Sequence, residues 1–485
     1  MGVQRKIAEI KDTPEKEIRR LVELQKQAHI TEGPMPAERR IELINKCIAL
    51  LIDNKDAIVE ALNDDFGSRS PEGSLATDVG GTLGALKYAR KNLKKWMRAS
   101  KRHSMFPLGV FGARTRVEYQ ALGCVGNVVP WNFPFNLAFG PMGSIFAAGN
   151  RTVIKPSEFT PHCSLLMKDL VSKYFREDEA VVVLGGPETG AIFSRMPFDH
   201  LLFTGATGIA HHIMRAAAEN LVPVTLELGG KSPVIVSDSA DMKKAAARVM
   251  TGKTLNAGQI CLAPDYVMVP RGKLDSFVGE ATASVETMFP TLKDNTDYTS
   301  IINQRHYDRL TGYIDDARAK GAKVIEINPA NEDFSQQPYF KVPPTIIVDP
   351  TDDMKVMQEE IFGPILPVKS YDQVDEAIKY VNDHDRPLGL YYFGEDAQEE
   401  NKVVTRTTSG GVAVNDVITH IMQDDAPFGG VGPSGTGAYH GHEGFVNFSH
   451  AKTVFRQTSV EKVAGMLRPP YGNQIRKMLN GMLKA

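Results

Sequence analysis

Residues 201–236 read LLFTGATGIAHHIMRAAAENLVPVTLELGGKSPVIV, and this stretch decides the fold class. Two apolar runs, Leu201–Thr204 and Val222–Leu228, are separated by a helical segment, and a third run follows at Val234–Val236. Strand, helix and strand in alternation are typical of a parallel α/β sheet. The alternation begins upstream, with apolar runs at Thr152–Ile154 and Ala180–Leu184. We therefore predict a parallel sheet covered by helices.

A second α/β series is expected to begin near residue 251. Its candidate strands are Tyr266–Val269, Lys323–Ile325 and Thr345–Val348. The first hundred residues are expected to be helical, because apolar residues recur there at helical spacing: Ile41, Ile44, Ile48 and Leu51, then Leu83, Leu86, Leu93 and Trp96. A strand-rich stretch is expected from Val117 to Val129. After about Gly410 the chain is rich in Gly and Pro, until an extended run is expected at Val446–Val454.

Composition excludes several classes of protein. The 485 residues carry a formal net charge of −2, which gives no general attraction to nucleic acid or to an anionic membrane. The four cysteines have no CxxC spacing, so we expect neither a disulfide framework nor a zinc ribbon, and a cytoplasmic location fits best. Residues 121–150 have no charged side chain, but their prolines and asparagines argue against a membrane span.

Three motif matches carry no function. The sequence Gly430-Val-Gly-Pro-Ser-Gly435 fits GxGxxG, but no strand precedes it and a proline interrupts it. Gly230-Lys-Ser232 ends like a phosphate-binding loop, but Thr225 stands where the first glycine belongs. His440, His442 and Glu443 do not complete a zincin motif, so no metal is predicted.

Three residues are candidates for covalent chemistry. Cys261 follows a Gly-Gln turn in Asn256-Ala-Gly-Gln-Ile-Cys261, where it is either a nucleophile or a small buried apolar residue. Glu227 lies inside the apolar run Val224–Leu228, where burial would raise its pKa into the range of a general base, unless it faces water on an edge strand. Asn132 lies between two prolines in Pro130–Pro134 and is either an oxyanion donor or an ordinary turn residue.

Taken together and in this order, these segments resemble the aldehyde dehydrogenase superfamily. The resemblance extends from about residue 40 to 455, and within the superfamily Asn415-Asp-Val417 and Gly437-Ala-Tyr-His-Gly441 look like the class 3 branch. Asp65-Phe-Gly-Ser-Arg69 adds a similarity to the coniferyl aldehyde dehydrogenases of that branch. The superfamily landmarks are Pro130-Trp-Asn-Phe-Pro134, Lys155-Pro-Ser-Glu158, Phe203-Thr-Gly-Ala-Thr207, Leu226-Glu-Leu-Gly-Gly-Lys231, Gly258-Gln-Ile-Cys261, Glu360-Ile-Phe-Gly-Pro364 and Pro427-Phe-Gly-Gly430.

The resemblance implies an α/β fold with a Rossmann-type cofactor domain, an α/β catalytic domain and a small β arm for oligomerisation. The cofactor domain and N-terminal helices would take residues 1–226, with part of the arm near 115–130. The catalytic domain would take residues 227–420. Residues 421–485 would form an active-site loop and the rest of the arm.

The resemblance also implies the site residues. Cys261 would be the nucleophile, Glu227 the base and Asn132 the oxyanion-hole amide. The cofactor would be NAD, with NADP possible, and its binding residues would be Lys155 and Glu158 at the adenosine ribose, Thr204 and Gly205 in the groove, Glu360 at the nicotinamide ribose and Phe362 beside it. Many relatives have Ser and Gly where this chain has Ala206 and Ala210, so one hydroxyl contact to the pyrophosphate is missing.

The expected reaction is oxidation of an aldehyde to a carboxylic acid through a Cys261 thiohemiacetal and a thioester, without a metal. The substrate would be a coniferyl-like aromatic or a medium-chain aldehyde, because Trp131, Phe133, Phe135 and Tyr439 could line an apolar tunnel. Two alternatives stay open: a thiol hydrolase that pairs Cys261 with a histidine, and a non-catalytic binding protein on this fold. We expect a homodimer or homotetramer, with no nucleic-acid or membrane partner.

Overall fold

A six-stranded sheet forms where the sequence predicts parallel strands. The computed structural model describes residues 8–466 and 468–483, and in this part of the chain the sheet has the order β15-β7-β6-β3-β4-β5. All neighbours are parallel except β15, which runs antiparallel to β7. The predicted parallel α/β organisation is confirmed. The strands are β3 (Cys124–Val128), β4 (Arg151–Lys155), β5 (Ala180–Val182), β6 (His200–Thr204), β7 (Val224–Glu227) and β15 (Gly435–Thr436).

A second sheet of seven strands has the order β10-β11-β12-β9-β8-β13-β14, with only β10 antiparallel to its neighbour. The predicted strand at Val234–Val236 exists as β8, but it belongs to this sheet and not to the first, because it pairs with β9 and β13. The strands are β8 (Pro233–Val236), β9 (Tyr266–Pro270), β10 (Lys323–Glu326), β11 (Thr345–Val348), β12 (Ile365–Tyr371), β13 (Gly389–Phe393) and β14 (Gly411–Val414).

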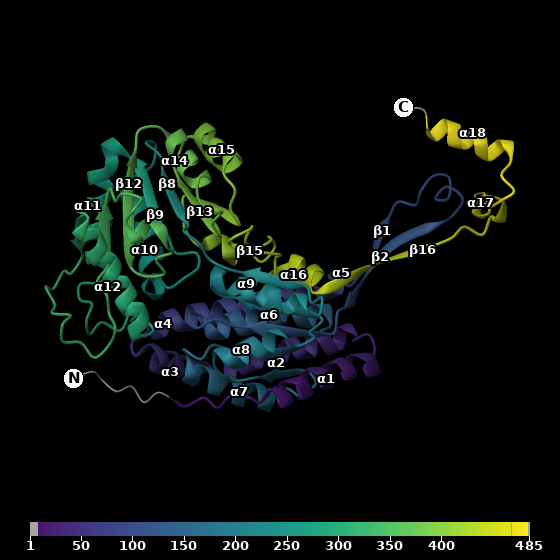
Figure 1. Ribbon diagram of the computed structural model, residues 1–485, viewed down its shortest axis with the longest axis horizontal. Helices are drawn as coiled ribbons and strands as arrows, with labels where there is room; N and C mark the ends of the chain where they lie inside the picture. The colour runs from purple at the N-terminus through teal and green to yellow at the C-terminus, as the bar shows by residue number, and fades with distance from the viewer. Residues whose placement is uncertain (1–7, 467, 484–485) are drawn as a thin grey trace.

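A three-stranded antiparallel arm projects from the body, with two helices beyond it (Figure 1). It consists of β1 (Ser100–Arg102), β2 (Arg114–Ala121) and β16 (Ser449–Arg456), followed by α17 (Glu461–Ala464) and α18 (Asn473–Met482). The stretch from Val117 to Val129, which was expected to be rich in strands, therefore contributes to two sheets. Strand β2 belongs to the arm, whereas β3 belongs to the six-stranded sheet. The extended run expected from Val446 begins only at Ser449, because Val446 itself lies in the helix Gly441–Asn447. The domain limits at 226 and 420 stay predictions.

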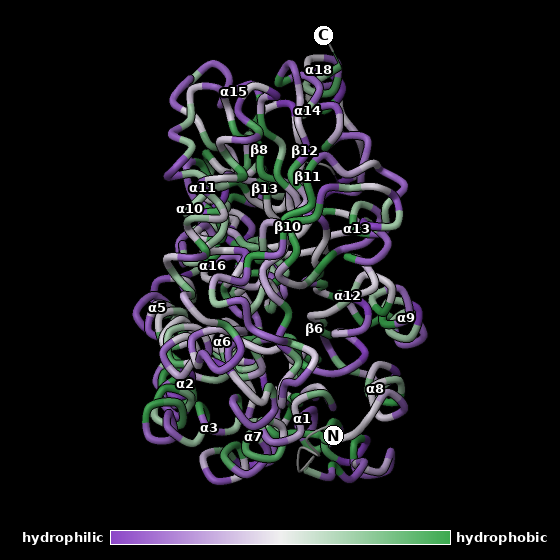
Figure 2. Tube along the Cα trace, turned by 90° about the vertical axis from the view of Figure 1, so that its left-hand side faces the viewer, coloured by the Kyte–Doolittle hydropathy of each residue, from purple (hydrophilic) through white to green (hydrophobic). Residues whose placement is uncertain are grey.

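Helices cover both large sheets. In Figure 2 the strands of the seven-stranded sheet are mainly hydrophobic, whereas hydrophilic and hydrophobic residues alternate along the surrounding helices. The N-terminal region is helical as predicted. Over the first sheet lie α1 (Glu15–Glu32), α2 (Ala37–Asp53), α3 (Lys55–Phe66), α4 (Pro71–Ser74), a π-helix (Leu75–Gly81), α5 (Thr82–Trp96), α6 (Pro134–Ala148), α7 (Pro161–Tyr174), α8 (Pro187–Ser194), α9 (Thr207–Ala218) and α16 (Gly441–Asn447). The second sheet carries α10 (Met242–Thr254), α11 (Leu274–Met288), α12 (Gln304–Ala319), α13 (Lys355–Gln358), α14 (Val374–Asn382) and α15 (Ala397–Arg406).

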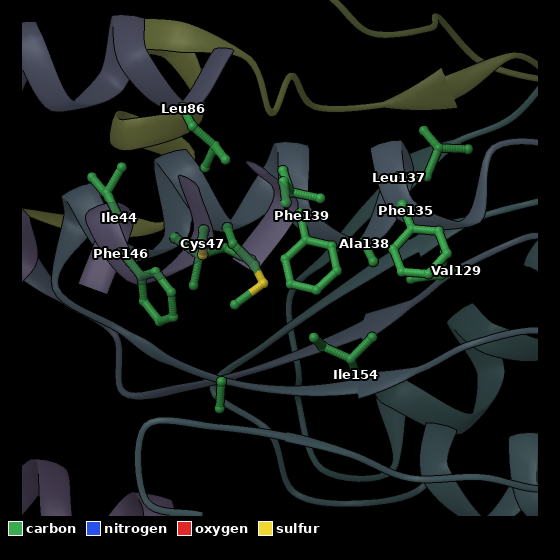
Figure 3. Close-up of a cluster of buried hydrophobic side chains, with 14 of the residues drawn as sticks. Ile44, Cys47, Leu86, Val129, Phe135, Leu137, Ala138, Phe139, Phe146 and Ile154 are labelled. Carbon is green, nitrogen blue, oxygen red and sulfur yellow. The ribbon is translucent and has the colours of Figure 1, made fainter. Parts of the chain in front are cut away.

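The uncharged stretch from residue 121 to 150 is core. It forms β3 and α6, and α6 packs between the sheet and the helices α2 and α5. Figure 3 shows Phe135, Phe139 and Phe146 of α6 pointing toward apolar side chains of the neighbouring elements, among them Ile44, Cys47 and Ile154. Within residues 8–466 and 468–483, no helix has the length and apolar character needed to cross a membrane.

Candidate active site

A cleft of about 660 Å³ brings seven of the nine predicted site residues together. It lies where the carboxyl ends of the parallel strands in the six-stranded sheet meet the amino ends of those in the seven-stranded sheet. Binding sites of open α/β sheets occur at the carboxyl ends of strands, because the loops that follow the strands converge there. The seven residues are Asn132, Thr204, Gly205, Glu227, Cys261, Glu360 and Phe362.

Cys261 is presented by a turn with unusual backbone conformation. Asn256, Ala257 and Gly258 all have positive φ, at 50°, 51° and 73°. A Cβ at Gly258 would lie 2.3 Å from the carbonyl oxygen of Gly363, so only glycine fits at this position. The half-buried Cys261 side chain lines the cleft. The absence of helical or strand periodicity in this segment follows from the turn.

The side chain of Gln259 fastens this turn to the protein. Its amide Nε2 donates to the carbonyl oxygens of Asn256 at 2.9 Å and Ser300 at 3.0 Å, and its Oε1 accepts from the backbone N–H of Ile302 at 3.0 Å. Gln259 is fully buried. The partners in all three hydrogen bonds are backbone atoms, so these bonds fix the path of the chain just before Cys261.

Asn132 is oriented toward the same turn. Its Nδ2 donates to the carbonyl oxygen of Gln259 at 3.1 Å, and the side chain is 3% exposed. The carbonyl of Asn132 accepts from Asn256 Nδ2 at 3.2 Å and from Arg69 Nη1 at 2.8 Å. An amide nitrogen carries two hydrogens, so Asn132 keeps a second N–H that can serve an oxyanion. The side-chain amide and the backbone carbonyl of Asn132 are thus held by separate hydrogen bonds.

Burial sets the protonation state of the thiol. It raises the pKa of Cys261 well above the usual range of a thiol, and the neighbouring carboxyl groups of Glu227 and Glu360 raise it further. Burial therefore favours the thiol form of Cys261 over the thiolate. A base or a cation must favour ionisation before Cys261 can attack.

Glu227 is a buried carboxyl group in the same cleft. It lies at the end of β7, pairs in register with Thr204 of β6, and is 1% exposed, so it does not face water on an edge strand. In the part of the chain that the structure describes, neither carboxyl oxygen has a hydrogen-bond partner. Burial without compensation raises the pKa of Glu227 well above its usual range. Such a carboxyl group accepts protons readily once it is ionised.

The middle of the cleft has features of a dinucleotide site. Thr204 is 7% exposed, and its Oγ1 has no partner among the described residues. Helix α9 begins just beyond it, and its N-cap Ala206 provides no side-chain hydrogen bond to the first turn. An orphaned hydroxyl and free backbone N–H groups at a helix N-terminus suit a phosphate group. These residues therefore fit the dinucleotide that the motifs imply.

Glu360 and Phe362 line the cleft near Cys261. Glu360 Oε1 accepts from the backbone N–H of Gly230 at 3.0 Å, and burial raises the pKa of this carboxyl group to about 7. A Cβ at Gly229 would lie 2.3 Å from the same oxygen, so a larger residue there would displace the Glu360 carboxyl group. Phe362 packs edge-on against Trp131, with ring centroids 5.4 Å apart.

Lys155 and Glu158 stand apart from the other seven predicted residues. Lys155 ends β4 and Glu158 lies just beyond it, at the carboxyl edge of the six-stranded sheet and outside the lining of the cleft. Lys155 Nζ lies 3.4 Å from Glu158 Oε2 and donates to the carbonyl oxygen of Pro156 at 3.0 Å. The two side chains thus form an ion pair beside the cleft.

The histidines near the C-terminus do not form a thiol–imidazole pair. His440 packs on Phe428 and Tyr439, with ring centroids 4.9 and 4.4 Å away, and burial lowers its pKa to about 4. His442 packs on Trp96 at 5.9 Å. Neither ring has a hydrogen bond to Cys261 in the described part of the chain, so the hydrolase alternative lacks its base.

The four rings expected to line a tunnel divide among three places. Phe135 is fully buried and stacked on Phe139, and Tyr439 is 2% exposed in the same core cluster, so these two pack the interior. Trp131 lines the main cleft, whereas Phe133 lines a smaller pocket of about 170 Å³. The single tunnel of four rings is therefore wrong, because α6 directs Phe135 into the core.

Two arginines that the sequence did not single out hold the site in place. Arg69 is buried in an ion pair with Asp78 at 2.7 Å and supports the carbonyl of Asn132. Arg309 donates to the carbonyl oxygens of Ile361 at 2.8 Å and Glu360 at 3.3 Å. Arg69 ends one of the quoted similarity segments, but no sequence signal pointed to Arg309.

Comparison with known proteins identifies similar sequences and folds. The relative "Probable coniferyl aldehyde dehydrogenase" of Caulobacter vibrioides is 61% identical over 468 residues, which are 96% of each chain. The solved structure "Substrate bound state of Staphylococcus Aureus AldH" has a TM-score of 0.90 at 35% identity and covers 96% of this chain and 99% of that one. A Mycobacterium tuberculosis aldehyde dehydrogenase complexed with NAD+ has a TM-score of 0.82 at 27% identity, with 92% of both chains covered.

These matches test the expected identity and fold. Relatives from family 3 are among those that match, and the similarity to coniferyl aldehyde dehydrogenases is confirmed. The α/β fold with a Rossmann-type sheet and a catalytic sheet is also confirmed. The protein is accordingly an NAD(P)-dependent enzyme that oxidises aldehydes, which removes the non-catalytic alternative. Residues 3–454 match the aldehyde dehydrogenase family, and the chain belongs to that family.

Proposed function

We propose that this enzyme oxidises coniferyl-like aromatic aldehydes to carboxylic acids, with Cys261 as the nucleophile, Glu227 as the base and Asn132 as the oxyanion donor. The observation that carries the proposal is the meeting of these three side chains in one cleft. They come from three separate segments of the chain, and a thiol, an unpaired carboxyl group and an anchored amide are the parts that acyl chemistry needs.

Asn132 and the backbone N–H of Cys261 stabilise the tetrahedral oxyanion that forms when sulfur adds to the aldehyde carbon. The bond from Asn132 Nδ2 to the Gln259 carbonyl at 3.1 Å fixes the amide beside the thiol turn before substrate arrives. A donor that needs no reorganisation contributes roughly 3–4 kcal/mol to transition-state stabilisation in comparable sites. The arginine bond to the Asn132 carbonyl supports the same orientation.

Glu227 works in two steps. Ionised Glu227 first takes the Cys261 proton and then releases it to solvent. Once ionised again, Glu227 takes a proton from the water that hydrolyses the thioester. Its unpartnered oxygens and raised pKa suit both transfers, because a carboxylate without hydrogen bonds is a strong base. The same raised pKa predicts that the rate increases with pH, since the base must be ionised.

NAD is the proposed cofactor, with some use of NADP, and when bound it supplies the hydride acceptor. Thr204, Gly205 and the start of α9 would hold its phosphates, while Glu360 would hold the nicotinamide ribose with Phe362 beside it. Lys155 and Glu158 would contact the adenosine ribose. In this ion pair Glu158 neutralises the charge of Lys155, so little electrostatic attraction remains for the 2′-phosphate of NADP.

The aromatic part of the substrate is assigned to the pocket of about 170 Å³ behind the thiol turn. Asn256 lines this pocket and donates to the carbonyl of Asn132, so the pocket abuts the turn that carries Cys261. Its apolar wall suits a flat ring: Phe133, Leu255, Met288 and Phe289. The 61% identical relative carries the name of a coniferyl aldehyde dehydrogenase, which supports the same substrate class.

Assembly into a homodimer or homotetramer through the projecting three-stranded arm belongs to the same proposal, as does a cytoplasmic location. The arm exposes Phe106 and Val110, which are 79% and 73% exposed, and a partner subunit would cover them. Analytical ultracentrifugation of the whole chain measures the subunit number.

A spectrophotometric assay tests the function. Coniferyl aldehyde and NAD are mixed with the enzyme, and NADH formation is followed by absorbance. Intact-protein mass spectrometry of Glu227→Gln under the same conditions should reveal an acyl group on the chain, located at Cys261 by peptide mapping. Absence of aldehyde-dependent NADH, or an acyl group on another cysteine, would contradict the proposal.

A further inference from the structure

Among the residues that the structure describes, three lysine or arginine side chains line the cleft, and two of them are bound to other groups of the protein. Lys231 pairs with Asp265 and donates to the carbonyl oxygens of Val356 and Glu359, both at 2.9 Å. Arg309 donates to two carbonyl oxygens and to the hydroxyl of Tyr313 at 3.2 Å. Both cations are therefore anchored to the walls of the cleft by these bonds.

Arg386 is the third cation, and it is uncommitted. It lines the cleft and is exposed, and within residues 8–466 and 468–483 it has neither a hydrogen bond nor an ion pair. Asp385 beside it also lines the cleft but makes no ion pair with it in that part of the chain. An exposed arginine without a partner is usually a solvated surface residue. Because Arg386 lines the cleft, it is also available to bind a ligand there.

The backbone places Arg386 on the wall formed by the seven-stranded sheet. It immediately precedes Pro387 and β13, so it lies at the amino edge from which Cys261 and Glu360 also project. The Cα of Pro387 lies 3.6 Å from where a Cβ of Gly230 would be. Because Gly230 follows β7 and binds Glu360, the Arg386 loop is packed against the junction of the two sheets.

The opposite wall offers an anion site that has no cation of its own. It consists of Thr204, the loop residues Gly205 and Ala206, and the first two residues of α9, Thr207 and Gly208, and none of these is a lysine or arginine. Thr204 is 93% buried, and its Oγ1 is unpartnered among the described residues. The N-cap Ala206 has no side chain that could satisfy the N–H groups of α9. A buried hydroxyl and free N–H groups on this wall point to a bound anion.

We propose that Arg386 binds the pyrophosphate of the dinucleotide from the wall opposite α9. Each phosphate of that group carries one negative charge, whereas the helix terminus supplies only about half a positive charge. Arg386 adds a full charge with a planar set of donors that match phosphate oxygens. It also offsets the hydroxyl contact that is lost because residue 206 is alanine. This role rests on the proposed use of NAD.

Direct binding of nucleotides tests the role without turnover. The dissociation constants of NADH, ADP-ribose and adenosine are measured by fluorescence titration or calorimetry for the wild-type chain, Arg386→Met and Arg386→Lys. We expect Arg386→Met to weaken NADH and ADP-ribose about tenfold, as for the loss of one partly exposed charge-assisted bond. Arg386→Lys should recover most of this loss, and adenosine, which has no phosphate, should bind all variants equally.

Ionic strength provides a second readout. The dissociation constant of NADH should rise with NaCl more steeply for the wild-type chain than for Arg386→Met, because the variant has lost a screened charge contact. Arg305→Met is the matched control, since Arg305 is exposed on α12 beside the cleft-lining His306 but does not line the cleft. Its dissociation constants should equal those of the wild type.

The failures of this role and of the proposed cofactor are distinguishable. If the wild-type chain binds NADH and Arg386→Met binds it equally well, the role of Arg386 is wrong. Equal losses for adenosine and ADP-ribose would also overturn it, because the effect would then lie outside the pyrophosphate. A wild-type chain that binds no NADH at all would overturn the cofactor proposal together with this role.

Discussion

Replacement of Gln259 by methionine tests whether one buried amide holds the nucleophile in place. Methionine keeps nearly the same length and fits an apolar site, but it cannot form any of the three bonds that Gln259 makes to backbone atoms. The carbonyl of Asn256 keeps a partner, because the backbone N–H of Gln259 also donates to it at 3.1 Å. The carbonyl of Ser300 and the N–H of Ile302 lose the partner that Gln259 provides.

The magnitude follows from these two groups. A buried backbone group without its partner costs about 1–3 kcal/mol, so Gln259→Met should destabilise the protein by about 2–6 kcal/mol. A melting temperature falls by about 2–4 °C per kcal/mol in domains of intermediate size, which makes a decrease on the order of 10 °C. The turn also carries Cys261 and the carbonyl that orients Asn132. A displacement of about 1 Å there reduces the rate by about 100-fold.

Two measurements separate stability from catalysis. Differential scanning fluorimetry gives the melting temperature, and rapid-quench acylation at a temperature where the variant is folded gives the rate of the first step. Gln304→Met is the matched control, because its exposed amide donates to Asp308 on the surface of α12 at 2.6 Å and has no other hydrogen bond among the described residues, so it should behave as wild type. A folded Gln259→Met variant that acylates at the wild-type rate would refute the argument that this amide positions the nucleophile.

Four further predictions concern the site itself. Cys261→Ala should abolish dehydrogenase turnover, whereas Cys47→Ala, a change inside the core, should leave the chemistry intact; normal turnover of purified Cys261→Ala would end the nucleophile assignment. Because burial raises the pKa of Glu227, the wild-type rate should rise with pH as this group ionises, and Glu227→Gln should lose that rise and accumulate acyl-enzyme; an unchanged pH profile would count against the base. Glu158→Gln frees the Lys155 cation, so the ratio of kcat/KM for NADP over NAD should increase about tenfold, and a constant ratio would contradict the ribose contact. In an aldehyde panel, cinnamaldehyde-type substrates should exceed acetaldehyde and succinic semialdehyde in kcat/KM, and Phe133→Ala should lower only the aromatic values, by about tenfold; a clear preference for acetaldehyde would rule out the apolar pocket.

Much of the fold could be predicted because its signals are local. Apolar runs separated by helical segments indicated strands, and β4, β6, β7, β9, β10 and β11 formed where they were expected. Helical spacing in the first hundred residues likewise gave α2 and α5, since a buried face repeats about every 3.6 residues. The site residues were named from short motifs whose glycines answer local needs, such as the positive φ of Gly258. These features depend on a few neighbouring residues.

The tertiary structure decided whatever depends on pairing across long distances in the chain. Val234–Val236 is a strand by its own composition, but only the neighbours β9 and β13 assign it to the seven-stranded sheet. Phe135 and Phe133 are two residues apart, and the packing of α6 sends one to the core and leaves the other in a pocket. Arg386 reaches the cleft wall opposite α9 only because the two sheets meet there. Sequence patterns specify which faces a segment buries, whereas the choice of partner is made by the packing of the whole chain.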